Sequence, residues 1–184
     1  MRLTATSLPS RIAAGIDALN EWVGRAVAWL TLAMVLLTLG IVIARYAFGW
    51  GSIAVQESVM YLHAITFMLG AAYTLRHDAH VRVDVFYRGL DPRRRAWVDA
   101  GGALFLLLPV CAFILYASFG YVAAAWAVHE GSRETGGLPW MWLLKTLIPV
   151  TAVLLGLQGI AQLIHALRVL RGREPPPVDA AEVP

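Results

Sequence analysis

Long apolar runs without a charged residue constrain this chain more than any other feature. Residues 26–44, 58–75 and 100–128 contain no Asp, Glu, Lys or Arg, and a fourth apolar segment, residues 140–167, contains only Lys145. About 20 helical residues cross the ~30 Å hydrocarbon core of a bilayer at 1.5 Å per residue. In lipid, backbone groups must be hydrogen-bonded within the segment itself, which favours helices. The sequence therefore predicts an all-α membrane protein with four transmembrane helices.

The composition agrees with a membrane location. Only 15% of the 184 residues are charged, whereas about 25% is usual in a soluble domain. The net charge of +3 comes from basic residues beside the apolar runs, which indicates membrane orientation rather than nucleic-acid binding. The single cysteine, Cys111, excludes a disulfide framework within the chain. No compact apolar segment precedes Asp17 and Glu21, so we expect the first long run to remain in the membrane rather than be cleaved as a signal peptide.

We expect one four-helix membrane domain over residues 1–167, followed by a tail, residues 168–184, that is basic and then rich in proline. The expected spans are residues 26–45, 53–75, 97–128 and 140–167. Because the third run is longer than one crossing requires, it must tilt, kink or extend beyond the hydrocarbon. Pro109 is the expected position of a kink.

Two further segments have the spacing of short amphipathic helices. Apolar residues recur at i, i+4, i+7 and i+11 in Ile12–Val23, and at i, i+3, i+4 and i+7 in Val83–Leu90. This periodicity is typical of helices that lie at the membrane surface. An alternating strand over residues 81–85 is the alternative, but its unpaired edge at a membrane is unfavourable. We therefore predict interfacial amphipathic helices before the first span and between spans two and three, with Asp91 and Pro92 beginning the third span's helix.

The distribution of basic residues predicts the orientation. Three lie before the first span, six lie in residues 71–95 and three follow the fourth span, whereas the two opposite loops hold only Arg45 and Arg133. Loops rich in Lys and Arg stay in the cytoplasm. Both termini and residues 71–95 are therefore expected to be cytoplasmic.

Glu57 and Lys145 are charged residues at the starts of the second and fourth spans. A charge in hydrocarbon costs roughly 2.5–3.5 kcal/mol on insertion scales, so each one requires a partner or a purpose. The sequence leaves three interpretations open. The two side chains pair with each other or with a partner subunit, each reaches interfacial water separately, or Glu57 forms a coupling site for an ion or proton.

Other polar residues of the spans are better explained by structure than by chemistry. His63 lies near the middle of the second span, and we interpret it as a histidine hydrogen-bonded between helices. A haem would need two histidines at similar depth, and the other four lie at other depths. Gln158 and Gln162 lie one turn apart on the fourth span, where we expect hydrogen bonds to another helix. We find no nucleophile–base pair, phosphate-binding loop or metal-ligand spacing in the sequence, which favours a scaffold or a subunit of a membrane complex.

Two stretches, residues 44–87 and 134–164, resemble a known family. They are similar to the small membrane (DctQ-like) subunit of tripartite ATP-independent periplasmic (TRAP) transporters, and closest to the branch labelled for mannitol or chloroaromatic compounds. The resemblance depends on the combination of Arg45-Tyr46-x-Phe48, Gln56-Glu57, Tyr61-Leu62, the run AYTLR followed by HVRVD, and GGLPW.

This resemblance implies a role in transport. It implies four transmembrane helices in the bacterial inner membrane, with an obligate large membrane subunit that carries the substrate and sodium sites and moves as an elevator. The small subunit would support that subunit, and a periplasmic solute-binding protein would deliver an organic acid or similar solute. No cofactor is expected in this chain, and none of its residues is expected to be catalytic.

Several residues become candidates for structural roles or partner contacts. We hypothesise that polar residues of the middle segment hold the second span at the cytoplasmic surface. These are Arg76, His80, Arg82 and Asp84. Glu57, His63, Lys145 and the loop Glu130–Gly137 are candidates for contact with membrane lipids, the large subunit or the binding protein, and Arg45 either extends to water or binds lipid headgroups.

Two alternatives come from other functional classes. One is the membrane anchor of a quinone-linked dehydrogenase with a b-type haem. The other is a small exporter that works alone, for which the spans offer few polar groups.

Overall fold

Four apolar helical segments, each long enough to cross a bilayer, make up most of the chain that the structure describes. The structure, a computed structural model, describes residues 8–80, 87 and 89–172. Its helices are α1 (Leu8–Phe48), α2 (Ile53–Arg76), α4 (Pro92–Gly102), the π-helix η1 (Ala103–Leu107), α5 (Leu108–Ala127) and α6 (Met141–Leu170). Among these residues no strand occurs, so the predicted all-α membrane fold is confirmed.

The first helix is longer than the sequence indicated. α1 contains 41 residues without a break, which corresponds to about 60 Å at 1.5 Å per residue. The segment before the first span is therefore helical, as predicted, but it continues the span rather than forming a separate helix. The reason is that the polar face of this first segment contacts α2 and α6, as shown below, rather than water alone.

The third span combines three helical pieces. It begins at Pro92, with Asp91 at the N-cap position as predicted, although the Asp91 side chain caps no backbone N–H. The π-helix η1 ends two residues before Pro109. Proline has no N–H to donate and its ring crowds the preceding turn, so a wider turn at this place relieves the misfit. The sequence predicted a kink at Pro109, and the irregularity that the structure describes there is the π-helix in the turn before it.

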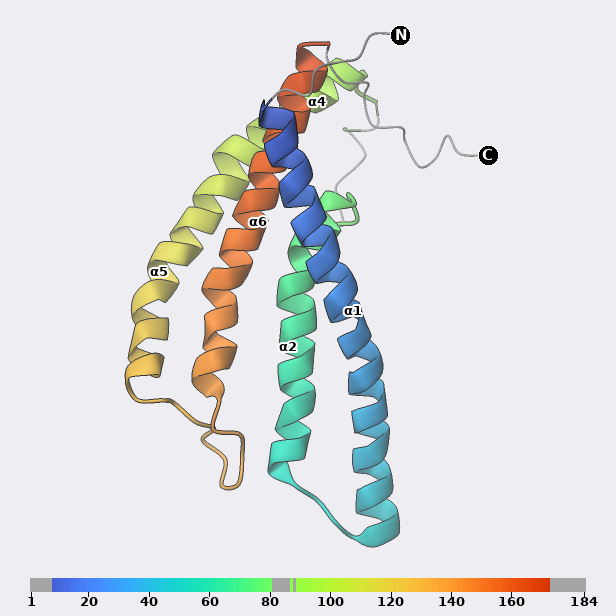
Figure 1. Cartoon of the computed structure of the whole chain (residues 1–184), viewed down its shortest axis with the longest axis vertical. Helices are drawn as coiled ribbons and strands as arrows, with labels where there is room; N and C mark the ends of the chain where they lie inside the picture. Colours follow the sequence, from blue (N-terminus) through green and yellow to red (C-terminus); the bar gives the residue numbers. More distant parts are fainter. Residues whose placement is uncertain (1–7, 81–86, 88, 173–184) are drawn as a thin grey trace.

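The helices form two antiparallel pairs that meet at one end of the molecule. α1 packs on α2 and α5 packs on α6, while α6 also contacts α1, α2 and α4. Figure 1 shows the start of α1, the end of α6 and α4 gathered at the same end, which we call the α4 end. The connections at residues 49–52 and 128–140 lie at the opposite end, the loop end (Figure 1). The chain thus brings its first and last described helical turns to the same side, as the sequence predicted.

Small side chains fill the interior. The buried apolar residues are mostly alanines, and Asn20 is the largest fully buried side chain. Large apolar side chains point outward instead; Trp29 is 73% exposed and Phe105 is 74% exposed. Close helix contact through small residues is characteristic of membrane proteins, where the outer surface faces lipid or another subunit.

Two predicted segments fall wholly or mainly outside the described residues. Of the interfacial helix expected at Val83–Leu90, the structure describes Tyr87, Gly89 and Leu90. The Tyr87 hydroxyl donates a 2.7 Å hydrogen bond to Asp99 of α4, which fixes this point of the segment beside the third span. The tail beyond Gly172 also lies outside the described residues.

Candidate functional site

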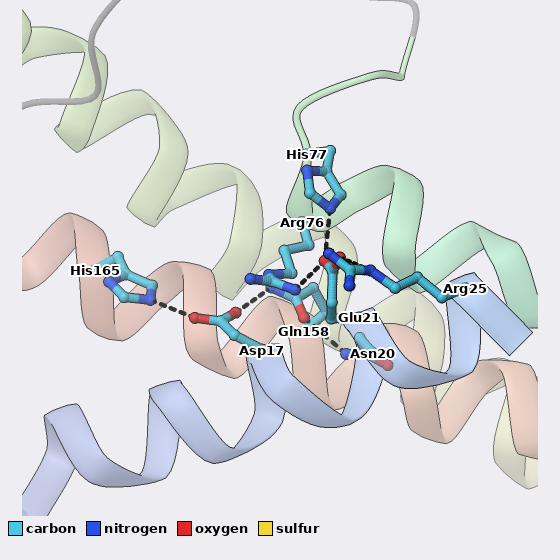
Figure 2. A network of polar contacts seen from close by, with 8 residues as sticks. All are labelled: Asp17, Asn20, Glu21, Arg25, Arg76, His77, Gln158 and His165. Atoms are coloured by element: carbon cyan, nitrogen blue, oxygen red, sulfur yellow. Dashed lines mark hydrogen bonds and ion pairs between the residues drawn. The ribbon is translucent and has the colours of Figure 1, made fainter.

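A network of polar side chains connects three helices near the α4 end. Figure 2 shows it between α1, α2 and α6. We call it the helix-junction network, and it comprises Asp17, Asn20, Glu21, Arg25, Arg76, His77, Gln158 and His165.

The first half of the network joins α1 to α6. The Asp17 carboxylate accepts a 2.9 Å hydrogen bond from the Gln158 amide nitrogen, and its other oxygen lies 3.0 Å from Nε2 of His165. The Gln158 carbonyl oxygen accepts a 2.7 Å hydrogen bond from Asn20. Both amide side chains are buried, with exposed fractions of 1% for Asn20 and 3% for Gln158. Since an unmade hydrogen bond is costly when buried, these contacts fix how α1 and α6 cross.

The second half of the network joins α1 to α2. Glu21 accepts hydrogen bonds from Arg76 and from Nε of Arg25, the latter at 2.6 Å. Nε2 of His77 lies 2.8 Å from the same carboxylate oxygen that binds Arg76. Three basic groups therefore surround one carboxylate, and two of them come from the end of α2. Figure 2 shows these side chains converging on Glu21.

The sequence positions these groups through the helical period. Asp17 and Glu21 lie one turn apart on α1, as do Asn20 and Gly24, so all four share one side of the helix. A Cβ built on Gly24 would lie 2.3 Å from the Tyr73 ring. The absence of a side chain at Gly24 thus lets α2 approach close enough for its last residues to reach Glu21.

A second group of contacts fixes the loop between α5 and α6. Glu57 of α2 accepts hydrogen bonds from the Ser132 hydroxyl and, at 2.6 Å, from the backbone N–H of Leu138. A Cβ on Gly137 would lie 2.8 Å from the Glu57 carboxylate. The loop therefore lies directly against the start of α2, and glycine is required where it passes closest.

Lys145 has a different partner. It forms an ion pair with Glu130, and its Nζ lies 4.0 Å from the centre of the Tyr121 ring. The interpretation that Glu57 and Lys145 pair with each other is therefore wrong for this chain. Each side chain instead meets the loop that follows α5, because the loop folds back over both helix starts and is rich in donors and acceptors.

Aromatic contacts complete the loop end. The indole nitrogen of Trp126 donates a 2.9 Å hydrogen bond to the Thr146 hydroxyl. The rings of Trp126 and Trp142 meet edge to face, 4.4 Å apart between centroids, and His129 packs edge-on against Trp142 at 5.8 Å. These contacts tie α5 to α6 beside the loop.

The candidate residues from the sequence divide between these groups. Arg76 belongs to the helix-junction network, where its partner is Glu21. Arg45 and His80 are exposed. Arg82 and Asp84 lie outside the described residues.

The predictions for Gln158 and His63 have opposite outcomes. The predicted interhelical hydrogen bond of Gln158 is confirmed by its contacts with Asn20 and Asp17. The predicted interhelical hydrogen bond of His63 within this chain is wrong, because His63 lies exposed on α2 and stacks on Phe67 with ring centroids 6.3 Å apart.

Sequence reasoning missed the acidic half of the helix-junction network. It placed Asp17 and Glu21 in an interfacial amphipathic helix without naming a partner for either, and it named no partner for His165. The one available signal was the one-turn spacing of Asp17 and Glu21, which places both carboxylates on a single face. The partners lie on distant segments, and no local pattern identifies them.

The described polar side chains of these groups connect helices to one another and to the loop after α5. The sequence profile of the family described as tripartite ATP-independent periplasmic transporters, DctQ component, matches residues 34–169. The chain belongs to this family. As a DctQ component it is part of a transporter rather than a member of an enzyme family. Comparison with curated proteins and comparison with solved structures each found no match.

The positions of four described histidines bear on the haem-binding alternative and agree with the family assignment. His165 lies beside Asp17, His77 beside Glu21 and His129 beside Trp142, while His63 is exposed on α2. These four side chains therefore contact different neighbours. The haem-binding anchor considered from the sequence receives no support from this arrangement.

Proposed function

We propose that this chain is the small permease subunit of a TRAP transporter and serves as a stationary scaffold for the large membrane subunit. The large subunit would move as an elevator and carry the solute and sodium sites. A periplasmic binding protein would deliver an organic acid or similar solute. The likeness of residues 44–87 and 134–164 further supports the mannitol- or chloroaromatic-type branch.

The observation that carries this proposal is that polar contacts tie α1, α2 and α6 together toward the α4 end and tie α2, α5 and α6 to one another or to the loop at the loop end. The helix-junction network connects α1, α2 and α6 at the α4 end, and the contacts of Glu57 and Lys145 fix the loop end. A subunit that must remain still while its partner moves needs such fixed helix positions. Charge-assisted hydrogen bonds at each end, which are stronger than hydrogen bonds between neutral groups, resist sliding of one helix along another.

The outer surface supports the same role. The large apolar side chains point away from the small-residue interior, so most of the chain's apolar area is available to lipid and to a second membrane protein. The alanine-filled interior leaves the described helices with few polar groups that face one another in mid-membrane. This arrangement favours a supporting subunit over an independent solute pathway.

We place the α4 end in the cytoplasm and the loop end in the periplasm of the bacterial inner membrane. The basic residues gathered at the α4 end support this orientation through the positive-inside rule. The loop Glu130–Gly137 then faces the side on which a binding protein would approach. Its tip, Arg133 to Gly136, is exposed, which makes it an available contact surface on that side.

Reconstitution tests the proposal. The chain, its large subunit and the binding protein are placed in proteoliposomes, and uptake of candidate organic acids is measured with and without an inward sodium gradient. We expect uptake only with all three proteins and the gradient. Uptake by the large subunit and binding protein at the full rate without this chain would contradict the scaffold role, and uptake by this chain alone would contradict the assignment of the solute pathway to the large subunit.

A further inference from the structure

The exposed residues of α2 all fall on one narrow line. Within Ile53–Arg76 they follow the spacing i, i+3, i+7, i+10 and i+14. Steps of three and four residues in alternation are typical of the face by which one helix packs on another. We call this line the α2 strip, and it consists of Ile53, Gln56, Met60, His63 and Phe67. The rest of α2 is half-buried or buried against the other helices.

Two members of the α2 strip, Gln56 and His63, are polar, and lipid gives no partner at the depth of His63. His63 lies ten residues into α2, about 15 Å along its axis and near the middle of the span. Within residues 8–80, 87 and 89–172, its contact is the ring of Phe67, and neither Gln56 nor His63 has a side-chain hydrogen bond. By contrast, the exposed Thr38 of α1 satisfies its hydroxyl on its own backbone, at Met34. An imidazole cannot do so, and hydrocarbon offers neither donor nor acceptor.

The α2 strip also leaves room for a neighbouring helix to approach closely. The next position in the same spacing is Gly70, where an added Cβ would meet no atom within 4 Å. The Thr74 hydroxyl beyond it bonds back to the Gly70 carbonyl at 3.0 Å, so this end presents no unsatisfied group. A helix lying along the strip would thus meet apolar side chains at Ile53, Met60 and Phe67 and a small residue at Gly70, which permits close contact.

We propose that the α2 strip binds a transmembrane helix of the large subunit, and that His63 forms a hydrogen bond with a polar group on that helix. This inference rests on the proposed function, which supplies the large subunit as the partner. The strip is long enough for one helix and has two unsatisfied polar side chains. The outer faces of α1 and α5 are broader and carry large apolar side chains such as Trp29 and Phe113, 73% and 68% exposed, which suit lipid.

Co-purification of the tagged full-length chain with its co-expressed large subunit tests the inference. We expect His63→Leu to weaken the association roughly 3- to 20-fold, because it removes an interhelical hydrogen bond in the membrane. The matched control is Tyr116→Phe, which removes a hydroxyl from an 85% exposed side chain of α5 and should leave association unchanged. If the α2 strip faced lipid, His63→Leu would leave binding unchanged or improve it.

A second variant pair tests close approach. Gly70→Leu adds bulk to the line of the α2 strip, and Gly120→Leu adds the same bulk to the exposed face of α5, where a Cβ also meets nothing within 4 Å. We expect Gly70→Leu to reduce association at least tenfold and Gly120→Leu to have little effect. Equal melting temperatures of the two isolated variants and the unaltered chain would show that folding is preserved.

Crosslinking identifies the occupant. Met60→benzoylphenylalanine should yield an adduct with the large subunit on illumination, whereas Phe113→benzoylphenylalanine should not. An adduct at Met60 with a second copy of this chain, or with lipid alone, would overturn the inference. If the unaltered chain captures the large subunit and the strip variants bind equally well, the docking site is wrong but the proposed function stands. If the unaltered chain captures no large subunit, the proposed function itself fails.

Discussion

The carboxylate of Asp17 lies 3.0 Å from the imidazole of His165, although 148 residues separate the two in the sequence. With the Gln158 hydrogen bond to the same carboxylate, this contact joins the first helix of the chain to the last. Such a contact closes the fold, because α1 and α6 are not neighbours in the sequence. Its loss should therefore affect the whole chain rather than one helix.

Removing the Asp17 carboxylate should destabilise the protein. In Asp17→Ala the buried Gln158 amide nitrogen loses its acceptor, which costs about 1–3 kcal/mol. We expect the unfolding midpoint of the purified chain in detergent to fall by roughly 4–8 °C for a loss of about 2 kcal/mol. Glu134→Ala, on the exposed loop, is the control and should change the midpoint little. Equal midpoints for the two variants would show that the contact contributes nothing to stability.

Glu21 and Arg76 should be energetically coupled. Each single substitution, Glu21→Gln or Arg76→Met, removes one charged member of the Glu21–Arg76 contact between α1 and α2 and leaves the other in place. The double variant lacks both charged groups. We expect a double-mutant cycle to give a coupling energy clearly different from zero, because the two groups share one contact. Arg25→Ala, which removes a 76% exposed partner on the same helix, should cost less than about 0.5 kcal/mol. Strict additivity in the cycle would contradict the interhelical contact.

Gly24→Ala and Gly15→Ala should have opposite effects on the same helix. At Gly24 the new Cβ would lie 2.3 Å from the Tyr73 ring, so α1 and α2 must separate locally, at a cost of about 1–3 kcal/mol. At Gly15 a Cβ meets no atom within 4 Å, and replacing a helical glycine should stabilise by about 0.5–1 kcal/mol. Thermal unfolding of the two variants measures both effects. Stabilisation by both would show that Tyr73 does not pack on Gly24.

Glu57 should protect the loop after α5 from opening. Its carboxylate accepts the Leu138 backbone N–H, and Glu57→Leu removes that acceptor. Because the loop then loses a charge-assisted hydrogen bond that must break before Leu138 exchanges, we expect amide exchange at Leu138 to accelerate about tenfold or more. Exchange measured by mass spectrometry over residues 130–140 tests this, with Glu134→Leu as the exposed control. Unchanged exchange in Glu57→Leu would indicate that the loop is fixed by other contacts.

Reporter fusions test the proposed orientation of the chain in the membrane. Alkaline phosphatase is active only outside the cytoplasm, so we expect activity when it is fused after Arg133 and none when it is fused after Arg88. The physical reason is that loops rich in Lys and Arg remain in the cytoplasm. A reporter that is active in the cytoplasm should give the complementary pattern. The reverse result would place the α4 end in the periplasm and would exchange the expected partners of the two ends.

The sequence by itself determined the membrane class and the arrangement of helices along the chain. Apolar length and the absence of charge act locally, since each residue contributes its transfer free energy wherever its neighbours lie. The N-cap position of Asp91 and the irregularity near Pro109 are likewise local, because they depend on backbone groups within one turn. The combination of motifs such as Gln56-Glu57 also identified the family.

Only the tertiary structure decided which polar groups meet. The sequence named no partner for Asp17, which binds His165 and Gln158. Glu57 was considered a partner for Lys145, yet each meets a different part of the loop after α5. It also showed that His63 points outward. A helical period tells which residues share a face, but the neighbour of that face depends on how separate helices cross. That crossing is set by close packing at residues such as Gly24, whose effect appears only when α2 lies against it.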